Sequence, residues 1–92
     1  MILRALTNGA ITAAETVAVK SGIVGGALIT ADGTNDATVV IRRENDAGKS
    51  ILHVVTKIPL WITGPFHLED TQAAYVSVSG TGARVQVYEW VS

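Results

Sequence analysis

The sequence of 92 residues contains no cysteine, only two prolines and few charged side chains, which make up 16% of the chain. Without cysteine there is no disulfide framework, no thiolate nucleophile and no cysteine-ligated zinc. Seven basic residues against eight acidic ones give a net charge of −1, so the basic surface that nucleic-acid binding requires is missing. Because 48% of the residues are hydrophobic, the chain is not of the disordered class, and its length allows one domain.

Long hydrophobic runs are also missing. An uncharged stretch near the start, residues 6–14, contains Thr7, Asn8, Gly9 and Thr12, so it does not resemble the apolar segment of a signal peptide. No stretch approaches the ~20 apolar residues that a membrane-spanning helix needs. We therefore expect a soluble chain that is made in the cytoplasm and has no membrane partner.

β-Branched side chains dominate what is present, since Val, Ile and Thr account for 30 of the 92 residues. Such side chains favour strands over helices. Turn residues divide the chain into short segments at the spacing typical of a sandwich or barrel. Strands are expected at residues 2–6, 16–20, 23–30, 38–43, 50–56, 73–79 and 84–91, with an edge strand or ordered loop at 60–63. Residues 68–74 offer the only helix signal, and it is a weak one.

These segments predict an all-β fold over residues 1–92, a single-domain antiparallel β-sandwich that is jelly-roll-like and has seven or eight strands. Residues 1–14 are expected to form either an N-terminal arm that orders on a partner or the first strand. Gly25 and Gly26 interrupt an apolar segment, which indicates a β-bulge or the close approach of another backbone.

Residues that could carry out chemistry are few. His53 and His67 are the only histidines, and no His-Glu-x-x-His or Gly-x-Ser-x-Gly motif accompanies them. A hydrolase would need His67 and Asp70 to converge with a Ser or Thr in a pocket. Asp32 and Asp36 flank a turn but supply too few oxygens for calcium unless another subunit adds ligands. We predict no catalytic residue, no metal site and no cofactor, and a protein that is not an enzyme.

The aromatic residues predict a binding surface. In the last strand Tyr88 and Trp90 alternate with Val85 and Val87, so the aromatic side chains face outward if the valines face the interior. An exposed Tyr–Trp pair has the composition of a protein interface, and it would also suit stacking against a sugar ring. The alternative is that Glu89 marks the solvent side and the aromatic side chains belong to the core.

Apolar residues on both faces of several strands, Val40 among them, need more cover than one small sandwich provides. Copies of the same chain are the simplest source of this cover, so we expect a homo-oligomer, with a cyclic trimer as its form. The predicted interface consists of Val40, Trp61, Tyr75, Tyr88 and Trp90. The alternative is a carbohydrate-binding sandwich that stacks sugars on Trp61, Tyr75 or Trp90, which predicts a monomer with an exposed, near-coplanar aromatic pair.

The order of segments from Val19 to the C-terminus resembles that of small bacteriophage structural proteins. The resemblance consists of a Lys-Ser-Gly opening to a glycine-rich strand at 20–27, a Val-rich strand within 30–43, an Asn-Asp-Ala-Gly hairpin at 45–48, an aromatic and proline segment at 61–66 and a closing Val-Gln-Val-Tyr strand at 85–88. It implies a virion component such as a capsid decoration (cement) protein or a β-domain of a head fibre or tail. Such proteins are often homotrimers, and the expected partner is the major capsid protein or another virion protein. No functional residue is carried over.

Overall fold

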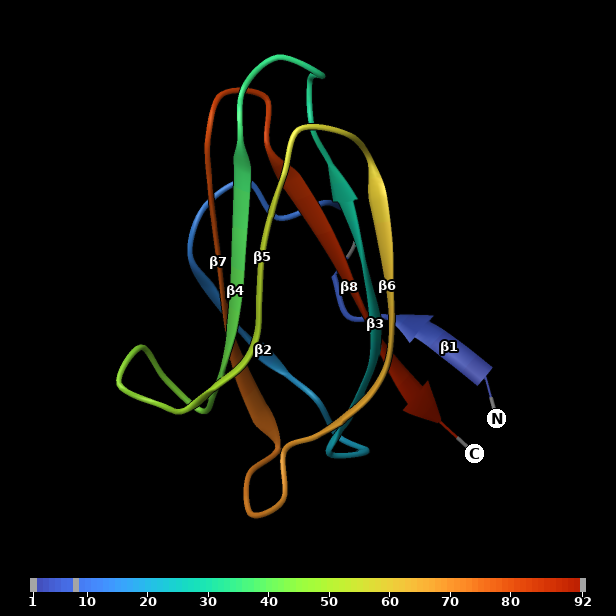
Figure 1. The fold of residues 1–92 in the computed structure, drawn as a ribbon. Helices are drawn as coiled ribbons and strands as arrows, with labels where there is room; N and C mark the ends of the chain where they lie inside the picture. Colours follow the sequence, from blue (N-terminus) through green and yellow to red (C-terminus); the bar gives the residue numbers. More distant parts are fainter. Residues whose placement is uncertain (1, 8, 92) are drawn as a thin grey trace.

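The structure is a computed structural model that describes residues 2–7 and 9–91, and these residues form eight strands in two layers (Figure 1). The strands are β1 (Ile2–Ala5), β2 (Glu15–Ala18), β3 (Ile23–Thr30), β4 (Ala37–Arg43), β5 (Ser50–Thr56), β6 (Leu60–His67), β7 (Ala73–Ser79) and β8 (Arg84–Val91). The expected all-β fold is confirmed. Residues 68–74 form a turn and the start of β7, so the weak helix signal there is wrong.

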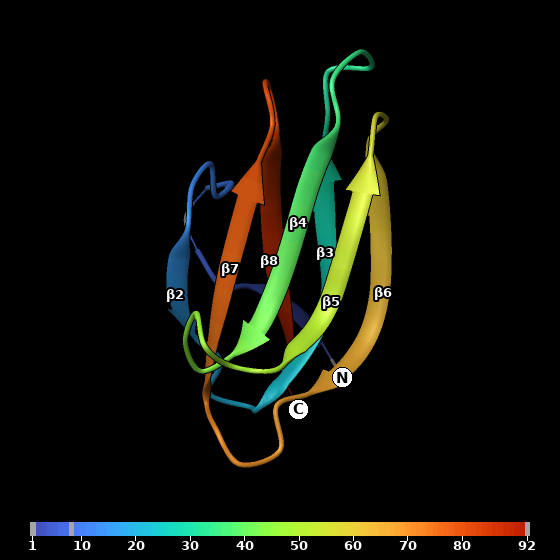
Figure 2. The ribbon, with the colours of Figure 1, turned by 60° about the vertical axis from the view of Figure 1, so that its left-hand side comes forward.

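Each layer is a four-stranded antiparallel sheet. One sheet has the order β1-β8-β3-β6 and the other the order β2-β7-β4-β5. Figure 2 shows the second sheet with its four strands side by side in that order. Every connection except the β4–β5 hairpin passes from one sheet to the other, which gives the strand order of an eight-stranded jelly roll. The predicted antiparallel sandwich is therefore confirmed.

The N-terminal segment is the first strand of the sandwich, which was one of the two expectations for it. β1 pairs antiparallel with β8, from Ile2 opposite Val91 to Ala5 opposite Tyr88. The connection to β2 then crosses the edge of the fold, where Ile11 makes an isolated bridge with Val85. The first and last strands therefore lie side by side at one corner of the molecule (Figure 1).

The strand between the two prolines is longer than expected, because β6 continues through Pro65 to His67. Proline lacks the N–H group that a central strand needs, and β6 lies at the edge of its sheet, where this loss is tolerated. The expected irregularity at the paired glycines is also present. The register of β3 against both β6 and β8 shifts between Val24 and Gly26.

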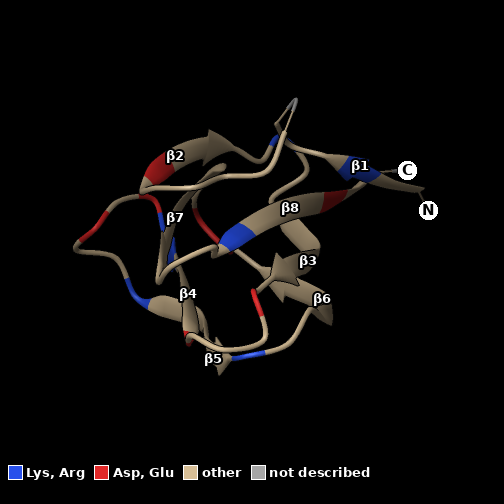
Figure 3. Cartoon of the chain, turned by 90° about the horizontal axis from the view of Figure 1, so that it is seen from above, with Lys and Arg blue, Asp and Glu red and all other residues tan. Residues whose placement is uncertain are grey.

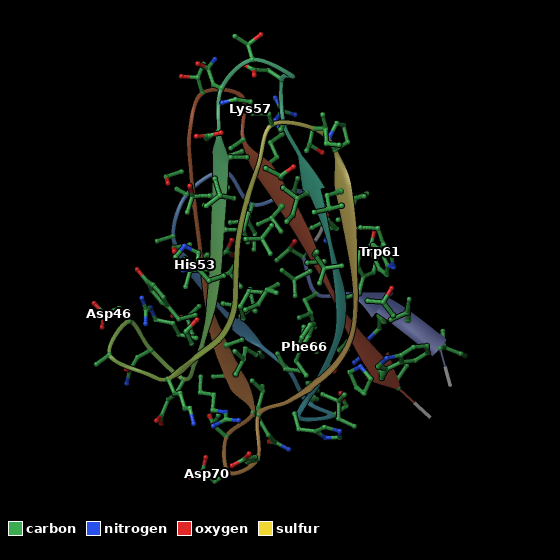
Figure 4. All side chains as sticks on the ribbon, in the orientation of Figure 1. Asp46, His53, Lys57, Trp61, Phe66 and Asp70 are labelled. Atoms are coloured by element: carbon green, nitrogen blue, oxygen red, sulfur yellow. The ribbon has the colours of Figure 1, made fainter. Side chains whose placement is uncertain are left out.

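The core lies between the two sheets and is almost entirely aliphatic. Residues of the core follow the period-two alternation of the central strands, in which every second side chain points inward. The apolar strand side chains with 0% exposure are Val24, Ala27, Ile29, Val39, Ile41, Ala74, Val76, Val85 and Val87. Phe66 reaches into the gap between the layers and packs against this core, whereas Trp61 points away from it (Figure 4). Each sheet also has an outer face that points away from this core.

Candidate functional site

The outer surface of the β1-β8-β3-β6 sheet carries the aromatic side chains of the last strand. Val85 and Val87 are fully buried, whereas Tyr88 and Trp90 alternate with them and are half-buried. The aromatic side chains therefore face outward, as one of the two interpretations of this strand predicts. The opposite interpretation, with Glu89 on the solvent side, is wrong because Glu89 is only 2% exposed.

Two glycines create the flat floor on which these rings lie. A Cβ atom at Gly25 would lie 2.4 Å from Leu3 Cδ2 and 2.9 Å from Trp90 Cδ1. A Cβ atom at Gly26 would lie 2.7 Å from a ring carbon of Trp61. Any side chain at either position would displace an indole ring, so the sequence Gly25-Gly26 is what lets both tryptophans pack flat against the sheet.

Trp61 and Tyr88 meet above the second of these glycines. Gly26 lies opposite Tyr88 in the ladder with β8, and Leu28 lies opposite Trp61 in the ladder with β6. The two ring centroids are 5.6 Å apart with planes at 64°, an edge-to-face contact. Trp61 and Leu28 nevertheless stay 41% and 42% exposed.

We define the aromatic face as the outward side chains of Leu3, Leu28, Trp61, Tyr88 and Trp90. These five side chains come from all four strands of the sheet. A pocket of about 300 Å³ adjoins the aromatic face where Trp90 meets Ile23, Pro65 and His67. The surface is thus a contiguous apolar patch with a hollow at one end, which is the shape of a protein or ligand contact.

The structure divides the five predicted interface residues between the two sheets. Trp61, Tyr88 and Trp90 come together on the aromatic face. Val40 and Tyr75 instead face outward from the other sheet, on β4 and β7, and both are half-buried. The two sheets lie back to back, so one flat partner cannot contact all five residues at once.

Leu3 and Leu28 complete the aromatic face, and sequence reasoning did not place them there. Leu28 carries the signal of an apolar residue that alternates with the buried Ala27 and Ile29. Leu3 carries no local signal, because β1 is a four-residue strand with only half-buried or exposed side chains. Its position follows from the pairing with Trp90, at the other end of the chain.

Glu89 forms the one ion pair of the described residues that reaches into the interior. Arg4 Nε donates to Glu89 Oε2 at 3.0 Å, a second Arg4 nitrogen donates to the same oxygen, and the Ser21 backbone N–H donates to Oε1 at 3.2 Å. Burial by itself raises the pKa of the Glu89 carboxyl, but the hydrogen bonds from Arg4 and Ser21 outweigh it and hold the pKa below its ordinary value. Figure 3 shows the charged positions of β1 and β8. The hydrogen bonds from Arg4 fasten β1 to β8.

His67 and Asp70 do not form the cluster that a hydrolase would need. The pocket of about 330 Å³ that His67 lines also contains Arg43, Ser50 and Glu69, not Asp70. Arg43 is engaged there, because it donates to Glu69 Oε1 at 3.1 Å and to the His67 carbonyl oxygen at 3.3 Å. Asp70 lies in the exposed loop before β7 (Figure 4).

Asp32 uses its oxygens to close the turn between β3 and β4. One oxygen accepts from the backbone N–H groups of Thr34 at 2.8 Å and Asn35 at 2.7 Å, and the other accepts from the Asn35 amide at 2.8 Å. These bonds hold the pKa of Asp32 below its ordinary value. Asp36 is paired with Lys57 at 3.0 Å. Within residues 2–7 and 9–91 no group of three or more His, Asp or Glu side chains gathers as a metal site would require.

In the same part of the chain, no helix is long and apolar enough to cross a membrane. Comparisons of this chain with protein-family models, with curated proteins and with solved structures find no match.

Proposed function

We propose that this chain is a non-enzymatic structural protein that assembles with copies of itself through the aromatic face. The observation that carries the proposal is the exposure of Trp61 and Leu28, which lie opposite each other on the outer surface of the neighbouring strands β6 and β3. Exposed apolar area costs roughly 25 cal/mol for each Å² left in water, so a contiguous aromatic patch favours association.

The size of the sheet fits a modest protein interface. With strands about 4.8 Å apart and about 3.3 Å per residue, the three eight-residue strands and the four-residue β1 give the sheet a footprint of roughly 450 Å². The accessible area is larger than the footprint because side chains protrude, and stable interfaces bury about 800 Å² per partner. The aromatic face occupies part of this surface, and its Trp and Tyr side chains are among the residue types that dominate binding energy.

The resemblance of residues 19–92 to small bacteriophage structural proteins supports a place on a virion, as a capsid decoration protein. The jelly-roll strand order supports the same proposal, because viral capsid domains use this architecture. On a capsid, a cyclic homo-oligomer such as a trimer would bind the major capsid protein or another virion protein through many copies, and multivalency would strengthen weak single contacts.

A carbohydrate-binding module remains the second candidate, since lectin domains also use jelly rolls and Trp61 offers an exposed ring. The angle between the rings of Trp61 and Tyr88 favours assembly over sugar stacking. The planes of Trp61 and Tyr88 meet at 64°, whereas a sugar platform made of two rings needs them nearly coplanar. Of the three residues named for sugar stacking, Trp61, Tyr75 and Trp90, Tyr75 lies on the other sheet.

Light scattering after size-exclusion chromatography tests the proposal. At micromolar concentration we expect a particle mass of at least two chains of 9.6 kDa each. Trp61→Ser and Leu28→Ser should shift the particle toward the monomer. Ile58→Ser is the matched control, because Ile58 is 62% exposed but lies in the β5–β6 loop, away from the aromatic face.

A monomeric wild-type chain at micromolar concentration would contradict the proposal. Quenching of tryptophan fluorescence by an oligosaccharide in that monomer, with loss of quenching in Trp61→Ser, would establish the carbohydrate-binding alternative instead. Circular dichroism of each variant separates loss of assembly from loss of folding.

A further inference from the structure

The edge strand β5 belongs to the β2-β7-β4-β5 sheet, which does not carry the aromatic face. β5 ends the β2-β7-β4-β5 sheet, and it pairs on one side with β4 from Ala37 opposite Thr56 to Ile41 opposite Leu52. Among the residues that the structure describes, no strand pairs with its other side. The backbone N–H and C=O groups along that side are available to another strand.

The other three edge strands carry features that discourage pairing, and β5 has fewer of them. β1 and β2 have four residues each, and β6 contains Pro65. β5 has seven residues, with no proline, no glycine and no charged side chain. Its one irregularity is a register shift at its beginning, beside Ser50, which leaves 52–56 regular. A long, uncharged edge of this kind is the usual site at which another strand adds to a sheet.

The order of polar and apolar residues in β5 is nearly the same in both directions. A second copy of β5 therefore fits the free edge of this strand. Ser50 and Thr56 are the polar ends, Leu52 and Val54 are apolar residues that face inward, and His53 is the centre. In antiparallel pairing about a two-fold axis at His53, residue 52 of one copy faces residue 54 of the other. The two strands then overlap over residues 50–56, with 52–54 outside the register shift in both copies, and apolar side chains meet apolar ones. An isologous contact needs this self-complementarity.

We propose that β5 pairs antiparallel with β5 of a second copy, with His53 opposite His53 on the two-fold axis. The two β2-β7-β4-β5 sheets would then join into one eight-stranded sheet. Lys49 and Lys57 flank the strand at opposite ends and would approach each other across the contact. Asp36 offsets one of these two positive charges, because it already pairs with Lys57 at 3.0 Å.

Single-cysteine variants test the pairing, because the chain has no cysteine of its own. His53→Cys should form a disulfide-linked dimer under mild oxidation, since directly opposite residues have Cβ atoms about 4.5–5.5 Å apart. Val55→Cys is the matched control, because Val55 is also exposed on β5 and has the same outward direction. Two copies of residue 55 would lie roughly 13 Å apart along the strands, too far for a disulfide. We expect cross-linking of the His53→Cys variant to be at least tenfold faster.

Two further variants at position 53 test the β5 pairing without a disulfide. His53→Lys would set two positive charges opposite each other and should raise the dissociation constant of the β5 contact at least tenfold. His53→Thr adds no charge and introduces a β-branched residue that suits a strand, so it should leave the constant within about threefold. The readout is hydrogen exchange of the backbone amides of 52–56, whose protection should rise with protein concentration in the wild type.

These readouts are local to β5, so they do not depend on whether the aromatic face assembles. Equal cross-linking at positions 53 and 55, or amide protection of 52–56 that does not change with concentration, would overturn the β5 pairing. The particle mass of the Trp61→Ser variant tests the aromatic face separately.

Discussion

Arg4 and Glu89 lie directly opposite each other in the β1–β8 ladder, and their side chains form an ion pair on the inner side of the sheet. Glu89 occupies the position that period-two alternation gives to a core residue after Val85 and Val87. Arg4 is exposed enough to keep contact with water, while Glu89 is not. The pair therefore lets a carboxylate lie beside the core, and it gives a strand with little buried surface a specific attachment.

Arg4→Ala should destabilise the fold by about 1–3 kcal/mol, the cost of leaving a buried acceptor without its partner. Glu89 would keep only the Ser21 backbone N–H, at 3.2 Å. Urea unfolding measures the effect. Arg84→Ala is the control, because Arg84 is an exposed arginine on β8, the strand that carries Glu89. Its removal should change the stability by less than about 0.5 kcal/mol. Equal effects of the two substitutions would show that the ion pair contributes nothing specific.

The stability that Glu89 contributes should be lost in acid. Its pKa in the folded state lies below the ordinary value, so the folded chain binds this proton less readily than the unfolded chain. The contribution is therefore complete above the ordinary pKa of a glutamate, about 4.3, and declines as the pH falls from there through the lowered pKa of the folded state.

Glu89→Gln isolates this contribution from that of Asp32, whose pKa is also lowered but which both proteins retain. The melting temperature of the wild type should exceed that of Glu89→Gln at pH 7, and the difference should narrow as the pH falls from 5 to 3. A difference that stays constant over this range would contradict the assigned role of the ionised carboxylate.

The sequence was sufficient for the fold because the strands of this chain carry their own signals. In β7, Ala74, Val76 and Val78 are buried and alternate with Tyr75 and Ser77, as their order predicts. Turn residues then separate the strands. Alternation shows which residues share a face, but it does not show which sheet a strand joins. For this reason Val40 and Tyr75 were grouped with Trp61 although they face outward from the other sheet.

The direction of the last strand shows a second limit. Glu89 has the same parity as Val85 and Val87, and a charged residue at a core position favours the opposite orientation of the strand. The orientation is settled by Arg4, which lies 85 residues away in the chain. No local pattern connects the two residues. Gly25 and Gly26 indicate a bulge or a close approach at this position of the sheet. The sequence does not show that the close neighbours are the indole rings of Trp61 and Trp90.

Gly26→Ala should destabilise the chain by about 1–3 kcal/mol, because the added methyl group overpacks the sheet surface. A Cβ at this position would lie 2.7 Å from the carbonyl oxygen of Ile62, which is backbone and cannot move away cheaply. Gly25→Ala should cost less, since its closest contact is the flexible end of Leu3. Gly9→Ala, with nothing within 4 Å, is the control and should be close to neutral. Urea midpoints of the three variants give the ranking, and a neutral Gly26→Ala would contradict the close packing of Trp61.

Trp61 and Tyr88 should be energetically coupled through their edge-to-face contact at 5.6 Å. A double-mutant cycle of Trp61→Ala and Tyr88→Ala, with all four proteins unfolded at one concentration, should give a coupling energy of about 0.5–1.5 kcal/mol. The matched cycle pairs Trp61→Ala with Tyr75→Ala. Tyr75 is an equally half-buried aromatic residue, but it lies on the other sheet, so the two effects should add to within about 0.5 kcal/mol. If the two cycles gave the same coupling energy, the contact between the rings would not be what stabilises the aromatic face. The position of the Trp61 ring would then be explained by its packing on Gly26 and not by its contact with Tyr88.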